Sequence, residues 1–179
     1  MDQHADPFGV LVELANRSLG TARGLPAQME AAPTWTGIGF ILADQRMVAP
    51  MSEVAELIPL PLSTNLPGVK SWVRGVSNVR GRLLPLIDLE AFFGGQLMGS
   101  SKTRRVLAVE TSDLYTGLIV SEVVGMLHFP TDTFAAKIPS SAAPFAAYSL
   151  GAYIHDGAVW TVFSPHRLVA DHRFINAAA

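Results

Sequence analysis

The chain repeats part of its own pattern, and this repeat limits the folds that are open to it. When the sequence is shifted by 69 positions, similar residues coincide without a gap: Phe40 with Val109, Asp44 with Asp113, Ser52 with Ser121, Glu53 with Glu122, and Val54 with Val123. A shift of 76 positions pairs Gly75 with Gly151, Gly81 with Gly157, Leu83 with Val159, and Leu86 with Val162. The offset grows because the second intervening loop, through Pro130–Pro144, is longer. The repeat predicts two similar lobes that face each other, with a groove at their seam.

Apolar residues alternate with small or polar neighbours at strand spacing through most of the chain. Clusters of Gly, Pro, Asp and Ser separate these runs at short intervals, which is typical of small barrels or a sandwich and not of a parallel sheet. We predict short helices at Ser52–Leu57, Leu89–Phe93 and Pro165–Val169. The predicted strands are Ile38–Leu42, Met47–Met51, Arg82–Leu89, Arg105–Glu110, Tyr115–Val120, Ala147–Ile154 and Ala158–Phe163.

An amphipathic helix is predicted over residues 7–23. Asp6 suits the N-cap and Pro7 the first helical position, and apolar residues then recur at helical spacing until Gly24 and Pro26. Residues 26–34 form a linker. We favour packing of this helix on the chain's own lobes, with docking on a partner as the alternative.

The composition excludes several classes of protein. Apolar residues make up 49% of the chain and charged residues only 16%, against about 25% in a typical soluble domain, so apolar side chains are left over for partner contacts. No apolar run approaches the ~20 residues of a membrane helix. Without cysteine there is no disulfide or zinc–cysteine site, and a net charge of −2 argues against a general nucleic-acid binder. The polar, acidic N-terminus is no secretory signal, and a cytoplasmic location fits.

The residues give no support for catalysis. The five histidines lack the spacing of a metal site, and no serine lies in a Gly-x-Ser-x-Gly elbow. Gly94-Gly95 lacks the lysine that a phosphate-binding loop needs. We therefore predict a binding module without catalytic, metal or cofactor residues, not an enzyme.

A basic, glycine-punctuated segment leads from Pro67 into an apolar strand that ends at Leu89. No acidic residue occurs between Glu56 and Asp88, and such a segment is typical of a surface that another macromolecule reads. Its cations are Lys70, Arg74, Arg80 and Arg82.

Single residues of this segment allow two interpretations. Arg80 can offer a planar fork of donors to a partner, or it can form an ordinary surface ion pair. Gly75 and Gly81 can permit close approach of a partner, or they can permit a turn or bulge. Of the tryptophans, Trp72 is the one we expect to be at least partly exposed.

The run WVRGVSNVRGRLLPLIDL over residues 72–89 resembles the signature of CheW-type adaptor domains from bacterial chemosensory systems. Flanking segments agree in order: the hairpin Ile38–Pro50, then Ser52–Ile58, Arg105–Val109 and Gly117–Val124. The resemblance spans about Trp35 to Val169. The N-terminal extension that ends at Gly24–Gln28, with Trp35–Phe40 and Phe163–Leu168, is similar more narrowly to adaptors of the type IV pilus (twitching motility) pathway.

This resemblance implies a mainly β fold of two SH3-like five-stranded barrel lobes with short helices, in addition to the N-terminal helix. It implies domains at 1–34 (helix and linker), 35–170 (CheW-like) and 171–179 (tail). It also implies a non-enzymatic adaptor that bridges the cytoplasmic tip of a methyl-accepting chemoreceptor to the regulatory domain of a CheA-like histidine kinase. Such an adaptor needs no cofactor, nucleic acid or membrane insertion, and it is cytoplasmic and recruited to receptor arrays at the inner membrane.

Carried over position by position, the resemblance places Arg80 as the polar anchor of a groove for the receptor's helical hairpin, with apolar contacts from Val54, Val123 and Met126. The complete set of expected contacts is Val54, Glu56, Gly75, Asn78, Arg80, Gly81, Gly117, Val123 and Met126. Two other functions stay open: an adaptor of flagellar chemotaxis, and a small barrel that binds a metabolite or peptide.

The chain departs from the family pattern at three places. Ser121 stands where many members carry aspartate, and this leaves partner choice at the groove open. Ser164-Pro165 stands where Asp-Leu is common, and Glu90 stands where a basic residue is common. For these last two departures, at strand ends, we expect little functional consequence.

Overall fold

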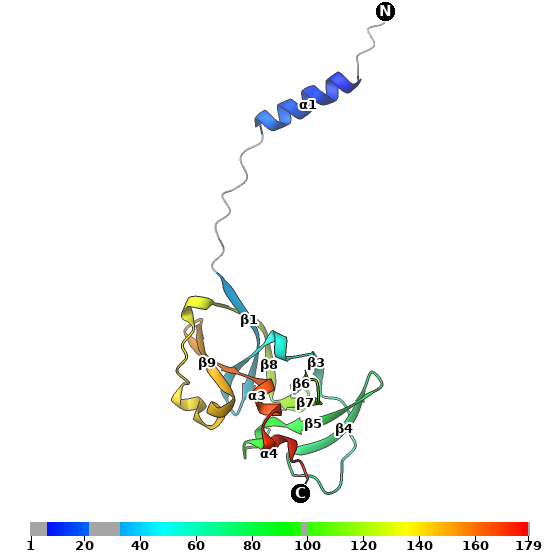
Figure 1. Cartoon of the computed structure of the whole chain (residues 1–179), viewed down its shortest axis with the longest axis vertical. Helices are drawn as coiled ribbons and strands as arrows, with labels where there is room; N and C mark the ends of the chain where they lie inside the picture. The colour runs from blue at the N-terminus through cyan, green and yellow to red at the C-terminus, as the bar shows by residue number, and fades with distance from the viewer. Residues whose placement is uncertain (1–6, 22–32, 98–99, 179) are drawn as a thin grey trace, which may run out of the picture. The chain divides into compact units, whose positions relative to one another are not determined.

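The computed structural model describes residues 7–21, 33–97 and 100–178 (Figure 1). They belong to two units: helix α1 (Pro7–Thr21) and a β-rich body that starts at Pro33. The helix predicted over 7–23 is therefore present. Its expected N-cap Asp6, its stop signals Gly24 and Pro26, and most of the linker lie outside the described residues. Among the described helices, none is long and apolar enough to cross a membrane.

The body consists of two five-stranded sheets, as predicted, and we call their lobes A and B. Sheet A has the order β8-β1-β2-β10-β9 and sheet B the order β3-β6-β7-β5-β4. The strands of sheet A are β1 (Thr34–Leu42), β2 (Gln45–Pro50), β8 (Glu122–Pro130), β9 (Ser149–His155) and β10 (Ala158–Phe163). Those of sheet B are β3 (Glu56–Pro59), β4 (Val73–Val79), β5 (Arg82–Asp88), β6 (Arg105–Glu110) and β7 (Tyr115–Val120). The helical segments are η1 (Met51–Glu53), α2 (Leu89–Phe92), η2 (Thr131–Thr133), η3 (Ser140–Tyr148), α3 (Pro165–Val169) and α4 (His172–Ile175).

The predicted repeat is confirmed, and its two halves exchange strands. At the offsets of 69 and 76, strands β1–β5 correspond in order to β6–β10, and the two strand orders are the same under this correspondence. The register agrees too, because Val162 opposite Val48 corresponds to Leu86 opposite Gly117. Each sheet nevertheless combines two strands of one half with three of the other. Sheet A combines β1 and β2 with β8, β9 and β10, and sheet B combines β6 and β7 with β3, β4 and β5. Figure 1 shows the result in sheet A, where blue β1 pairs with yellow-green β8.

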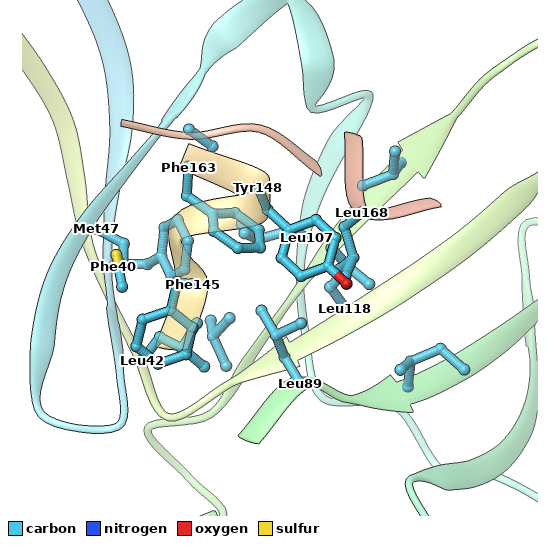
Figure 2. Close-up of a cluster of buried hydrophobic side chains, with 14 of the residues drawn as sticks. Phe40, Leu42, Met47, Leu89, Leu107, Leu118, Phe145, Tyr148, Phe163 and Leu168 are labelled. Atoms are coloured by element: carbon cyan, nitrogen blue, oxygen red, sulfur yellow. The ribbon is translucent and has the colours of Figure 1, made fainter. Parts of the chain in front are cut away.

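One hydrophobic core joins the two lobes. Phe40, Leu42 and Phe163 of sheet A are fully buried, as are Leu107 and Leu118 of sheet B, and all five belong to the same cluster (Figure 2). Burial of each such side chain contributes about 1.5–3 kcal/mol. The lobes therefore share one interior.

Trp72 corrects an expectation. It is only 8% exposed, and its ring stacks on Phe174 of α4 and meets the edge of Phe92, with centroids 5.9 and 5.3 Å away. The neighbouring run Pro67–Ser71 suggested exposure, but the ring of Trp72 belongs to the core that the lobes share. The segment predicted as a C-terminal tail supplies Phe174 to this core, and its Ala178 bridges to Val69.

The helix predicted at Ser52–Leu57 is wrong beyond its first turn. Only Met51–Glu53 is helical, since Glu56–Pro59 pairs with β6 instead. Strands β4 and β8 were not predicted. Strand β4 contains Gly75 and polar residues of low strand propensity, while β8 alternates between exposed and half-buried positions and is interrupted by Gly125.

Candidate protein-binding site

Arg80 lies at the tip of the β4–β5 hairpin. The two-residue loop Arg80–Gly81 has φ angles of 52° and 82°, a pair of positive values that matches the twist of a tight hairpin and suits glycine at the second position. The amide of Gly81 donates to Oδ1 of Asn78 at 2.9 Å, which secures the turn. The hairpin therefore places the arginine outside the barrel, with 79% of its side chain exposed.

The Arg80 guanidinium pairs with Glu56. Its Nη2 lies 2.6 Å from Oε1 of Glu56 on β3, whose side chain is 25% exposed. Strands β3 and β4 are the two edges of sheet B, so the ion pair links one edge of the sheet to the hairpin at the other. The structure thus brings Glu56, Asn78, Arg80 and Gly81 together. An exposed ion pair contributes little stability, about 0–1 kcal/mol. Arg80 and Glu56 can therefore give up their ion pair and interact with a partner instead.

Two of the three expected apolar contacts, Val54 and Val123, lie at the seam of the lobes. Val54 and Val123 are half-buried and pack against the core that the lobes share. Met126 lies opposite Ile38 on β8 and is 58% exposed. Val54 and Val123 correspond in the repeat, so each lobe contributes one of these valines after the chain has crossed from the other lobe. The roles of these residues in binding stay predictions.

Gly75 and Gly117 do not line a surface, which corrects their expected position in the groove. Both are buried. A Cβ on Gly75 would lie 2.2 Å from the carbonyl oxygen of Thr64, and one on Gly117 would lie 2.6 Å from a methyl group of Val106. Close approach of the chain's own atoms already accounts for glycine at both positions, and their part in partner binding stays a prediction.

The hairpin also carries contacts that were not predicted from the sequence. Arg82 forms two hydrogen bonds to the carboxylate of Glu110, at 2.7 and 3.2 Å, and its guanidinium lies 3.9 Å from the ring centroid of Tyr115. Through these hydrogen bonds Arg82 holds the pKa of the Glu110 carboxyl below its ordinary value. Leu83, opposite Asn78, is 70% exposed. The register of β5 accounts for its outward direction.

A pocket of about 490 Å³ lies between lobe B and the C-terminal helices. Pro85, Ile87, Leu114, Val169 and Phe174 supply much of its apolar lining. It is distinct from the interior of lobe B, where Leu84, Leu86, Val106 and Ile119 form a separate buried cluster.

Comparisons with known proteins agree with this architecture. The chain matches the CheW-like domain family over residues 36–173. It is 49% identical to the protein PilI of Pseudomonas aeruginosa over 172 residues, which cover 96% of each chain. It is 32% identical to the protein FrzA of Myxococcus xanthus over 109 residues, which cover 60% of this chain and 66% of FrzA.

The crystal structure of the scaffolding protein TtCheW from Thermoanaerobacter tengcongensis has the same fold. It superposes with a TM-score of 0.69 and 23% identity, and the match covers 83% of this chain and 96% of TtCheW. The family match extends from β1 to α4 and so includes both lobes and the hairpin of Arg80. The chain is therefore a member of the CheW-like domain family, whose proteins are non-enzymatic adaptors, and a homologue of PilI.

Proposed function

We propose that this chain couples a methyl-accepting chemoreceptor to a CheA-like histidine kinase in the chemosensory pathway that controls type IV pili. One face binds the cytoplasmic tip of the receptor, and the chain also binds the CheW-like regulatory domain of the kinase. The protein is cytoplasmic and is recruited to receptor arrays at the inner membrane. Individual contacts can be weak, because an array links many sites and raises the effective concentration of each.

The observation that carries the proposal is the Arg80–Glu56 pair at the tip of the hairpin. The Arg80 side chain is exposed, and its ion pair with Glu56 fixes the position of the guanidinium. No acidic residue lies between Glu56 and Asp88 in the sequence. Its five donors suit carboxylates or backbone carbonyls at the end of a receptor helix. Met126, Val54 and Val123 offer apolar surface to the same helical hairpin, as in other helix-in-groove complexes.

The test is a binding experiment with purified wild-type protein and an Arg80→Ala variant. Each is measured against a receptor's cytoplasmic fragment and against the kinase's regulatory domain. Wild type binds both, and the variant binds the receptor more weakly while it binds the kinase normally. Alanine and arginine both carry a Cβ atom, so a positive φ costs both about the same conformational energy. The substitution therefore leaves the turn intact.

An Arg82→Ala variant is the matched control, because it removes an exposed ion pair from the same hairpin without touching Glu56. Equal loss of receptor binding in both variants would show that the general charge of the hairpin matters and not Arg80. Absence of binding by folded wild type would reject the adaptor proposal. The apolar pocket beside Phe174 would then become the first place to search for a small ligand.

A further inference from the structure

The described strands are connected in such a way that the chain crosses between the lobes at two points. The first crossing leads from β2 through η1 to β3, and the second leads from β7 through Ser121 to β8. Val54 lies at the end of the first crossing, and Val123 lies directly after the second. Whatever fixes the two crossings therefore fixes the two valines.

A hydrogen-bonded clamp holds the first crossing. Oε2 of Glu53 accepts the hydroxyl of Ser164 at 2.7 Å and the backbone N–H of His166 at 2.9 Å. Ser164 is buried and also caps α3, since its oxygen accepts the N–H of Arg167 at 3.2 Å. Hydrogen bonds to an ionised carboxylate are roughly twice as strong as neutral ones. The first crossing is thus tied to the start of α3.

A second clamp holds the other crossing with the chemical roles exchanged. Here the crossing supplies the hydroxyl, and Ser121 donates to Oε1 of Glu90 on α2. The same oxygen faces the backbone N–H of Ala43, 3.4 Å away in the β1–β2 turn of lobe A. Glu90 is only 3% exposed, so these protein groups replace the water that a carboxylate needs.

The two clamps occupy equivalent places in the repeat. Helices α2 and α3 follow the equivalent strands β5 and β10, and Ser52-Glu53 corresponds to Ser121-Glu122.

We propose that Glu53 and Glu90 are positioning residues for partner binding. Glu53 holds the first crossing in the position that presents Val54 to the receptor helix, and Glu90 does the same for the second crossing and Val123. Neither glutamate needs to touch the partner. This inference rests on the proposed function for its effect on affinity. Its structural part, the placement of the two valines, can be measured in the free protein.

The experiment compares Glu53→Ala and Glu90→Ala with Glu53→Gln and Glu90→Gln. Glutamine keeps an oxygen that accepts the same hydrogen bonds, so both Gln variants retain receptor affinity within about twofold, while each Ala variant loses about tenfold. In NMR spectra of the free Ala variants, the methyl signals of Val54 or Val123 shift. Glu110→Ala is the control, since it removes an exposed carboxylate that ties no crossing.

Ser164→Ala and Ser121→Ala each remove one donor from a clamp and serve where a Glu→Ala variant does not fold. Unchanged methyl signals and unchanged receptor affinity would overturn the proposal. A parallel loss of receptor binding, kinase binding and thermal stability would also overturn it, because the clamps would then only stabilise the fold. If wild type binds no receptor, the proposed function fails, and the methyl signals still decide whether the clamps place the valines.

Discussion

Replacement of Gly75 by alanine should be among the most damaging single-methyl changes in this domain. Gly75 has a φ angle of 133° and lies where β4 bulges and passes the chain at Thr64. Thr64 and Val76 exchange two backbone hydrogen bonds of 2.9 Å across this passage. An added Cβ would lie 2.2 Å from the oxygen that accepts one of them, and backbone cannot move aside as a flexible side chain can.

Two costs add up. The positive φ costs about 1–2 kcal/mol for a residue with a Cβ, and an overpacked contact costs about 1–3 kcal/mol. A total near 3 kcal/mol, with a slope of about 2 kcal/mol per molar urea, lowers the urea midpoint by about 1.5 M. Equilibrium unfolding followed by tryptophan fluorescence measures this shift.

Gly81→Ala is the matched control. Gly81 also has a positive φ, of 82°, but an added Cβ would meet no atom within 4 Å. Only the conformational cost of about 1–2 kcal/mol remains, and the urea midpoint falls by about half as much. Equal stabilities of the two variants would refute the reasoning, since the contact with Thr64 would then cost nothing.

Three further results are expected. Leu118→Ala, in the shared core, costs about 2–5 kcal/mol in urea unfolding, whereas Leu83→Ala stays within about 0.5 kcal/mol because its side chain is exposed. Met126→Asp weakens binding of the receptor fragment in a calorimetric titration without a change in thermal stability; unchanged affinity would mean that the groove lies elsewhere. Hydrogen bonds from Tyr148 and Arg173 lower the pKa of Asp171 from 3.8 to about 2, so its ionised form stabilises the fold above about pH 4, and this stabilisation is lost as the pH falls towards 2. The melting temperature of Asp171→Asn should therefore approach that of wild type between pH 4 and 2, and a constant difference would contradict this.

The repeat could be predicted from the sequence because equivalent positions in the two halves need the same type of residue. Gly75 and Gly151 both have positive φ angles and both pass close to a backbone oxygen, and Gly81 and Gly157 both close two-residue turns. The exchange of strands between the lobes could not be predicted. Exchanged and unexchanged barrels bury the same faces of the same strands, so hydrophobic periodicity is identical in both.

The candidate site was predicted unevenly for a similar reason. The exposed turn around Arg80 could be predicted, because Gly81 suits the second position of a two-residue hairpin loop. Gly75 and Gly117 could not be assigned in this way, because a glycine that admits a partner and a glycine that admits the chain's own backbone look the same in a sequence. The clamps of Glu53 and Glu90 join residues 111 and 31 positions apart, and only the folded arrangement of the lobes brings these together.

The shared core gives these clamps their importance. Sheet B is continuous in sequence from Glu56 to Val120, while sheet A is assembled from segments on both sides of it. Separation of the lobes would expose the fully buried Leu107 and Leu118 together with Phe40 and Phe163, so the seam stays closed while the domain is folded. A binding surface on such a seam is preorganised, and preorganisation lowers the entropy that binding must overcome. With a fixed seam, the remaining freedom lies in the crossings themselves, which is where the half-buried Glu53 and the buried Glu90 make their hydrogen bonds.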